Sequence, residues 1–335
     1  MRSRKRLLLS NQAAVYHVMS RTAYRSLLFG DEEKEIFTRM LFQQAVFAGV
    51  DVLGYCVMGN HIHLLLRVVP VDSLPDDVLL GRYRQYYGSQ KTPQSTYSVE
   101  GLEQILRDGG SEADKARRRV IARMGDLPAF MRELKQRFTI WYNHKHANVG
   151  TIWAARYKSL LVEDSPESLT RIAAYLDLNP VRAKLVGDPK NYRWCGYAAA
   201  LGGNRLMRSA VIQLFGQKLD FAEALKSYRI ILYGKGYLSK SAGNSGSADS
   251  GTISAEKLEE VLQRGGQVPL HEFLRMRVRY FADGCVLGSK SFVESVFREH
   301  RDLFGTKRKK AGKALPGSAW GQLHSMRDLK KRVYS

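Results

Sequence analysis

The sequence predicts an α+β fold in which helices pack against an antiparallel sheet. Strand-like and helix-like segments follow one another in its first half in the order β, α, β, β, α, β, α. Two of the strand-like segments are separated only by a Gly-Asn turn, which is typical of a β-hairpin. The composition is that of a globular protein, with 44% hydrophobic and 25% charged residues in a chain of 335. This length suits about two domains, and no apolar run approaches the roughly 18 residues of a membrane span.

Each expected element has its own local signal. Alternation of apolar and polar residues indicates strands. Asp31 and Ser165 are placed to cap helices, and Pro166 suits a first helical position. Apolar residues at spacings of three and four from Leu127 to Trp141 indicate a long helix. The expected strands are 14–20, 52–58, 61–69 and 158–162, and the expected helices are 31–47, 127–143, 165–178 and 181–186.

The composition divides the chain into three parts. Residues 1–197 form the α+β domain, with a surface insertion at about 70–126 that is rich in Pro, Gly, Ser and charged residues. Residues 198–254 form a helical connection that ends in a Gly/Ser-rich linker at 239–254. Residues 255–335 form a basic and mainly helical C-terminal region.

The excess of positive charge is the first indication of function. The chain has 53 Lys and Arg against 32 Asp and Glu, a formal net charge of +21. Such a charge favours a polyanionic partner, nucleic acid above all, although a basic protein can also be merely soluble. We expect the basic run at 307–310 to bind phosphate, the alternative being a solvated chain end. This run consists of Lys307, Arg308, Lys309 and Lys310.

The C-terminal region also carries a pattern that fits duplex DNA. Helical periodicity at 255–263, 270–282 and 290–301 places two helices around a turn at 283–288, and Ser289 is placed to cap the second. This order fits a helix-turn-helix, which reads duplex DNA through its second helix. Because helical hairpins are common, a plain structural pair of helices is the alternative.

His61 and His63 are candidate metal ligands. Residues two apart on a strand face the same side, so both imidazoles leave one face of the sheet. They form a partial site that needs at least one further ligand, and the alternative is a polar pair on a solvated face. His144 and His146 have the same spacing, but Lys145 between them would repel a metal ion. The three cysteines are far apart and predict neither a zinc site nor a disulfide framework.

Tyr175 is the candidate nucleophile. It lies on the helix that begins near Ser165, and Asn179 follows four residues later on the same face. A phenol has a pKa of about 10, so a divalent cation nearby would help it to react. The alternatives are a half-buried aromatic side chain for Tyr175 and a plain N-cap before Pro180 for Asn179.

Three motifs, in this order, resemble those of REP-associated tyrosine transposases, which are single-tyrosine HUH transposases of the insertion-sequence-200-like group. The first is GNHIHLLL at 59–66, in which two histidines flank a hydrophobic residue. The second is GTIWAARYKSLLV at 150–162, and the third is YLDLNPVRA at 175–183. The resemblance covers about residues 13–197.

The resemblance implies a ferredoxin-like antiparallel sheet, the HUH endonuclease core. It implies that His61 and His63 hold Mg²⁺ or Mn²⁺ over the scissile phosphate and that Tyr175 is the nucleophile. It also implies that Asn179, where simple relatives have glutamine, is the third ligand. Basic side chains would hold the DNA backbone and aromatic ones would stack bases, unless the aromatic residues anchor the core. The residues for these two roles are Arg156, Lys158, Trp153 and Tyr157.

The function expected from these features is that of a metal-dependent transposase or single-strand DNA endonuclease. It would cleave and rejoin hairpin-containing single-stranded DNA through a 5′-phosphotyrosine. The alternatives are a catalytically silent protein that binds hairpin or repeat DNA, and an RNA-binding protein. We expect a monomer or homodimer in the bacterial cytoplasm, associated with the nucleoid and not with a membrane.

Overall fold

Four antiparallel strands form the centre of the molecule. The computed structural model describes residues 6–9, 11–88, 95–233, 284–315, 323–327 and 329. Its central strands lie in the order β2-β3-β1-β4, with helices α1 and α5 connecting them, which is a ferredoxin-like arrangement. The α+β fold is therefore confirmed. These elements are β1 (Ala14–Arg21), α1 (Asp31–Ala48), β2 (Val50–Val57), β3 (His61–Val68), α5 (Leu127–Lys145) and β4 (Lys158–Val162).

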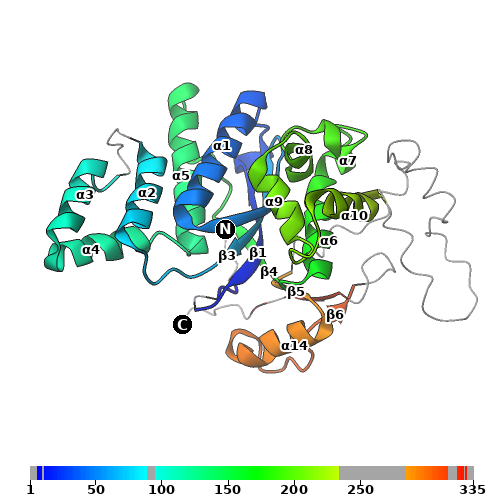
Figure 1. Ribbon diagram of the computed structural model, residues 1–335. Coiled ribbons are helices and arrows are strands. Elements are labelled where there is room, and N and C mark those ends of the chain that lie inside the picture. The colour runs from blue at the N-terminus through cyan, green and yellow to red at the C-terminus, as the bar shows by residue number, and fades with distance from the viewer. Residues whose placement is uncertain are drawn as a thin grey trace, which may run out of the picture.

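Alternation along the strands divides the core into two layers, because successive side chains point to opposite faces. Tyr16 and Leu64 belong to the layer that packs against α1 and α5. Val15 and Leu65 belong to the other layer, together with residues of α6 (Pro166–Asp177). Figure 1 shows α1 and α5 on one side of the sheet and α6 on the other. The second layer is where His61, His63 and Tyr175 are expected to meet.

The capping residues were predicted with mixed success. Ser165 accepts a hydrogen bond from the Ser168 amide and Pro166 begins α6, as expected. Asp31, in contrast, is the first helical residue of α1 rather than its cap. Gly30 takes the cap position and makes no side-chain bond. The Asp31 side chain then lies in the first turn, where its negative charge interacts favourably with the positive end of the helix dipole.

The remaining helices extend the two layers. The expected insertion contains three helices, α2 (Asp76–Tyr87), α3 (Val99–Asp108) and α4 (Gly110–Ile121), which lie beyond α1 in Figure 1. Among the described residues, no helix is long and apolar enough to cross a membrane. The other elements up to residue 233 are η1 (Ala23–Arg25), α7 (Asn179–Arg182), η2 (Pro189–Asn191), α8 (Gly196–Leu201), α9 (Arg205–Gln213) and α10 (Phe221–Tyr233).

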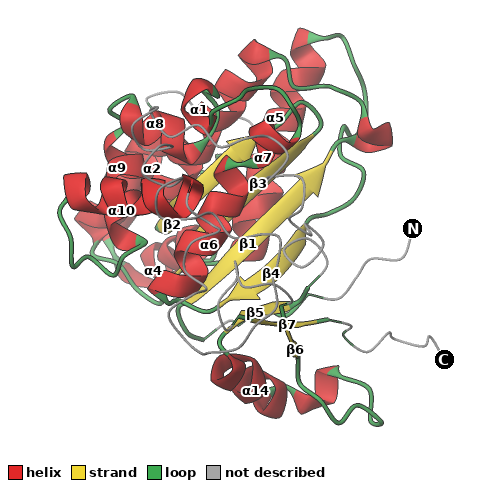
Figure 2. Ribbon diagram, turned by 90° about the vertical axis from the view of Figure 1, so that its right-hand side faces the viewer, coloured by secondary structure: helices red, strands yellow, loops and turns green. Residues whose placement is uncertain are grey.

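The C-terminal residues extend the same sheet. Strand β5 (Val286–Gly288) pairs in parallel with β4, and β7 (His324–Met326) and β6 (Lys313–Ala314) follow it, giving seven strands. Figure 2 shows this extension, with α14 (Lys290–Glu299) beside it. The helix and its Ser289 cap were expected, but the strands were not, because three-residue strands are too short to show alternation. The 3₁₀ turn η3 (Arg301–Leu303) follows α14.

The helix-turn-helix is therefore not supported by the part that is described. The segment expected as its turn contains β5. The expected helices at 255–263 and 270–282 and the linker at 239–254 lie outside the described residues.

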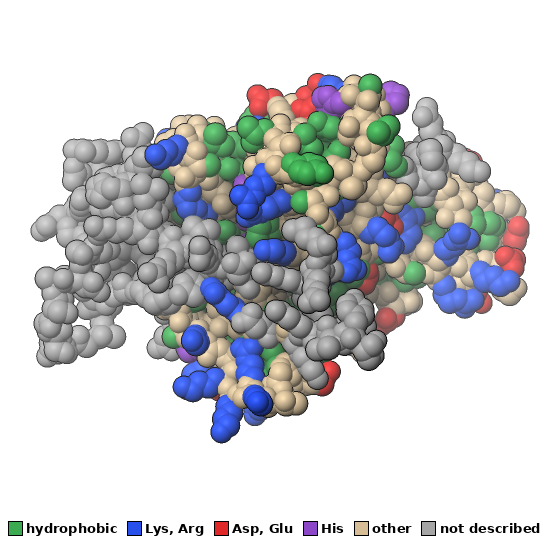
Figure 3. All heavy atoms as spheres, turned by 180° about the vertical axis from the view of Figure 1, so that it is seen from behind, with side chains coloured by type: hydrophobic (Ala, Val, Ile, Leu, Met, Phe, Trp, Pro, Cys, Tyr) green, Lys and Arg blue, Asp and Glu red, His purple; other side chains and the backbone are tan. Residues whose placement is uncertain are grey.

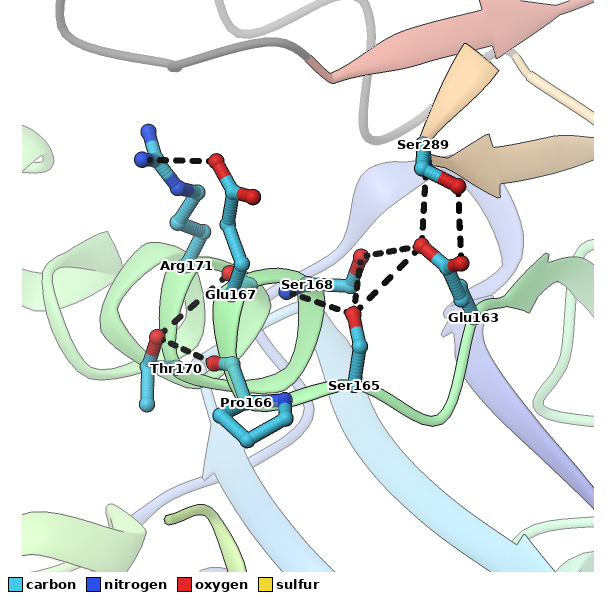
Figure 4. Close-up of polar contacts among 8 residues, drawn as sticks. All are labelled: Glu163, Ser165, Pro166, Glu167, Ser168, Thr170, Arg171 and Ser289. Atoms are coloured by element: carbon cyan, nitrogen blue, oxygen red, sulfur yellow. Dashed lines mark hydrogen bonds and ion pairs between the residues drawn. The ribbon is translucent and has the colours of Figure 1, made fainter. Parts of the chain in front are cut away.

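Glu163 joins the C-terminal extension to the core. Its carboxylate accepts hydrogen bonds from the Ser289 amide at 2.7 Å and the Ser289 hydroxyl at 2.8 Å. The hydroxyls of Ser165 and Ser168 donate to the same carboxylate at 3.4 Å. Figure 4 shows Glu163 between the start of α6 and the start of α14. One carboxylate thus fixes the caps of two helices.

Candidate functional site

Three histidines from two neighbouring strands form a cluster. Met19 of β1 is paired with His63 of β3, so His17 projects from the same face as His63. The His17 Nε2 and His63 Nδ1 atoms are 2.9 Å apart, and the two rings are stacked with centroids 5.2 Å apart. The ring of His61 meets that of His63 edge-on at 5.0 Å. The two expected histidines are thus joined by a third.

Tyr175 of α6 completes this cluster, because its ring covers the histidine rings on the same face of the sheet. It lies in the last turns of α6, which packs on β2 and β3, and its ring centroid is 5.7 Å from those of both His17 and His63. Its side chain is buried, with 2% exposed. The structure therefore brings the candidate nucleophile and the candidate ligands into one cluster of packed rings, although they are far apart in sequence.

The end of α6 holds Tyr175 in place. The Arg182 guanidinium lies over the Tyr175 ring, with Cζ 4.4 Å from the centroid, and also donates to the Tyr175 carbonyl. The Asn179 Nδ2 atom donates to the carbonyls of Tyr175 at 3.0 Å and Leu176 at 3.3 Å. Asn179 therefore caps the C-terminal end of α6, and it is the first residue of α7, whose N-cap position is taken by Leu178, so the alternative expectation of an N-cap before Pro180 is wrong. Only the amide oxygen of Asn179 is a suitable atom for a metal ion.

Asn60 fixes the tautomer of His61. Its Nδ2 donates to the Arg25 carbonyl at 3.1 Å, so the amide oxygen must face the His61 Nδ1 atom, 2.7 Å away. A carboxamide oxygen can only accept a hydrogen bond. The proton of a neutral His61 ring therefore resides on Nδ1, which leaves the Nε2 lone pair for a ligand.

Both candidate ligands are held in the neutral state. Burial, followed by the charge of Arg21, lowers the pKa of His61 to about 4. Burial also lowers the pKa of His63, and the neighbouring His17 lowers it further. Because only a neutral imidazole coordinates a metal ion, the two rings remain in the coordinating form at physiological pH.

The residues expected to contact DNA differ in their surroundings. Arg156 and Lys158 are exposed. Trp153 is 6% exposed, and its Nε1 donates to the Lys135 carbonyl and to the Thr139 hydroxyl. It is a core anchor and presents no open face to a base. The Tyr157 ring is half-buried beneath the Arg6 guanidinium, 4.1 Å from its centroid.

The competing histidine pair is used elsewhere. His144 lies in the last turn of α5, and the His146 Nε2 atom is 2.9 Å from the Glu33 Oε1 atom. Within the part of the chain that is described, no three His, Cys, Asp or Glu side chains are grouped to hold a metal ion. A metal ion bound by His61 and His63 would thus need further ligands that are not His, Cys, Asp or Glu side chains, such as amide or phosphate oxygens.

The basic run at 307–310 contains two kinds of residue. Arg308 donates to the carbonyls of Lys310 at 2.9 Å, Ala311 at 2.6 Å and Arg327, so it shapes the loop. Lys307, Lys309 and Lys310 are exposed. Figure 3 shows the molecule from behind, and Lys and Arg side chains gather over the lower part of this face, where α14 and the following loop lie.

Three residues of this site were missed in the sequence: His17, Asn60 and Arg182. His17 is a single histidine in an apolar strand, and only the pairing of β1 with β3 shows its relation to His63. Asn60 was interpreted as a turn residue, and Arg182 was noted only as part of a motif. Each acts through a contact that residue spacing does not show.

Comparison with known proteins supports part of this picture. Residues 10–79 match the family model described as "Transposase IS200 like". This segment holds β1, α1, β2 and β3 and confirms the resemblance to this group. No curated protein matches. A solved structure described as "Structure of the REP associates tyrosine transposase bound to a REP hairpin" matches with 12% identity and a TM-score of 0.37, over 61% of this chain and 87% of that one.

Proposed function

We propose that this protein is a transposase-type endonuclease that cleaves and rejoins single-stranded DNA containing hairpins, with Tyr175 as the nucleophile. The observation that carries the proposal is the ring cluster itself, in which a buried phenol ring lies 5.7 Å from the ring of His63. The family match of residues 10–79 covers both candidate ligands. The net charge of +21 suits a polyanionic substrate.

The donor atoms of the cluster are chemically suited to a divalent cation. The Nε2 atom of His61 is left for a ligand by the bond to Asn60, and His63 offers its own Nε2 when its Nδ1 donates to His17. The amide oxygen of Asn179 is the candidate third ligand. When bound, Mg²⁺ or Mn²⁺ would polarise the scissile phosphate and align it for attack. All three protein donors are neutral, so the DNA phosphate supplies the balancing negative charge.

The reaction then follows from the position of the phenol. The Tyr175 oxygen attacks phosphorus, the new O–P bond forms, and the bond from phosphorus to the 3′ oxygen breaks. The phenol proton is released, and the 3′ oxygen takes up a proton to become a hydroxyl. The step replaces the phosphoester bond to the 3′ oxygen with a phosphoester bond to Tyr175. A 3′-hydroxyl of a second strand can therefore reverse the step and join the two strands without ATP. The stacked Arg182 holds the Tyr175 ring in place.

The experiment that tests this proposal is formation of a covalent adduct. Wild-type protein incubated with hairpin oligonucleotides and Mn²⁺ should yield a protein–DNA adduct that survives denaturing electrophoresis. Tyr175→Phe should abolish the adduct and leave hairpin affinity within about twofold, because only the attacking oxygen is lost. Tyr157→Phe is the matched control and should form adduct normally. An adduct that persists in Tyr175→Phe would refute the assignment.

A catalytically silent binding protein is the second candidate. The 2% exposure of Tyr175 favours it, since a phosphate must reach the phenol before it reacts. Tight hairpin binding by the wild-type protein without any adduct, across Mg²⁺ and Mn²⁺, would support that candidate. Preference for RNA over DNA of the same sequence would support the RNA-binding alternative.

A further inference from the structure

The turn after β1 displays a tyrosine in an unfavourable backbone conformation. Tyr24 has φ 55° and ψ 13°, and Arg25 has φ 57°, so two consecutive non-glycine residues adopt the left-handed region. This region is disfavoured for side chains with a Cβ atom, and a bulky residue there is an outlier. The Tyr24 side chain is 99% exposed and gains nothing from packing. Backbone strain of this kind is concentrated at functional sites.

Several hydrogen bonds hold the turn in this shape. The Ala23 amide donates to the Ile152 carbonyl at 2.8 Å, and the Thr22 hydroxyl donates to the Ser26 carbonyl at 2.7 Å. Asn60 donates to the Arg25 carbonyl from the other side. The exposed ring is thus presented by a braced turn.

The same contacts connect the turn to the candidate active site. Asn60 bonds to the Arg25 carbonyl with its amide nitrogen and to His61 with its amide oxygen. Arg21, three residues before Tyr24, is paired with His61 in the sheet. Tyr24 therefore belongs to the end of the sheet at which β3 begins and His61 lies.

Exposed cations surround this end of the sheet. Arg21 and Arg25 flank the turn, and both are exposed. Lys158 is paired with Met19 across β1 and β4, and the Ser20 hydroxyl donates to the Arg156 carbonyl. An exposed aromatic ring among cations is the combination that binds single-stranded nucleic acid, in which the ring stacks on a base and the cations hold phosphates.

We propose that Tyr24 is a stacking platform for an unpaired nucleobase of the DNA strand whose phosphate reacts at the cluster of His61, His63 and Tyr175. The proposal rests on the proposed function and deepens it by naming a base-binding subsite. Leu27, 79% exposed in the same turn, would suit a protein partner instead, and the cations favour the nucleic acid. The subsite takes any base, because every base has a π-face.

Binding of two hairpins tests the platform. One hairpin is blunt and the other carries an unpaired 5′ flank with 2-aminopurine, and both are measured with Tyr175→Phe protein in EDTA, so that no cleavage intervenes. Tyr24→Leu should weaken the flanked hairpin by roughly 5- to 150-fold, the value of one stacked base, and leave the blunt one unchanged. Tyr24→Phe should keep both affinities and the quenching of 2-aminopurine. Leu27→Ala is the matched control for a change in the turn.

The outcomes separate this proposal from the proposed function. Loss of flank-dependent binding in Tyr24→Leu supports the platform even if wild-type protein forms no adduct. Equal affinities of Tyr24→Leu and the parent for the flanked hairpin would overturn it. An equal loss for both hairpins would also overturn it, since that result indicates general phosphate binding. A loss of flanked-hairpin affinity in Leu27→Ala as large as that in Tyr24→Leu would also overturn it, since that result shows that the shape of the turn, and not the Tyr24 ring, supports binding.

Discussion

Among single residues, His17 is the one whose contacts explain how His63 is oriented. The 2.9 Å bond between His17 Nε2 and His63 Nδ1 fixes the ring of a buried side chain, since both residues are 2% exposed. A metal-binding histidine is oriented by the partner of its other ring nitrogen, and loss of such a partner costs roughly 10- to 100-fold in metal affinity. His17 is therefore a positioning residue for the proposed metal site.

His17→Leu should lower Mn²⁺ affinity by roughly 10- to 100-fold, measured by electron paramagnetic resonance of free Mn²⁺. His17→Gln, whose amide oxygen replaces the accepting Nε2, should restore most of it. In metal-free protein, ¹⁵N spectra of the imidazoles should show His63 protonated on Nδ1 in the wild type and a mixture of tautomers in His17→Leu. If the Gln variant loses as much affinity as the Leu variant with unchanged tautomers, His17 serves packing alone.

The sequence predicts those residues of the site that the periodicity of a single strand or helix places on one face. His61 and His63 share a face because a strand has period two, and Tyr175 and Asn179 lie near each other because a helix has period 3.6. His17 could not be placed this way, since it meets His63 across 46 residues of sequence. Trp153 fitted both a base-stacking and a core role until its bonds to the carbonyl of Lys135 and to Thr139 were known.

Among the elements, the junction of α6 with α14 depends on Glu163. Glu163→Ala removes the acceptor of the Ser289 amide and hydroxyl, and hydrogen bonds to a charged group contribute about 1.5–3 kcal/mol. The C-terminal extension should then open more often, so amides of β5 should exchange faster with solvent in hydrogen–deuterium exchange. Glu167→Ala is the control, because that carboxylate is exposed and pairs only with Arg171 within α6. Unchanged exchange in β5 would contradict the role of Glu163.

The longer elements were predictable and the shortest were not. The strands of the hairpin and helix α5 contain enough residues for their periods to appear in the sequence. Strands β5, β6 and β7 have two or three residues each. Their existence depends on the edge of β4, which offers backbone groups for pairing. That edge exists only in the assembled sheet, so no local pattern in residues 284–326 predicts these strands.

In the whole molecule, one sheet connects the candidate site with a basic loop. The histidines of the site lie on β1 and β3, and the basic loop 305–313 leads into β6 at the far edge of the same sheet. Arg301 and Arg308 organise this loop through backbone carbonyls, while its lysines face outward. We therefore expect this loop to be an arm of fixed shape that adds phosphate contacts without reading bases.

Replacing the four lysines of this loop by glutamine should weaken DNA binding and make the remaining affinity less dependent on salt concentration. Each lost phosphate contact lowers the slope of log K against log salt by about 0.7 for single-stranded DNA, so the combined variant should lose at most about 3 units of slope. The affinities of unrelated hairpins should fall by the same factor, because phosphates carry no sequence information. Arg118→Gln with Arg119→Gln on α4, away from the sheet, is the charge control and should keep the parent slope. A loss confined to one hairpin sequence would show instead that the loop contacts bases. The four lysines are Lys307, Lys309, Lys310 and Lys313, all exposed.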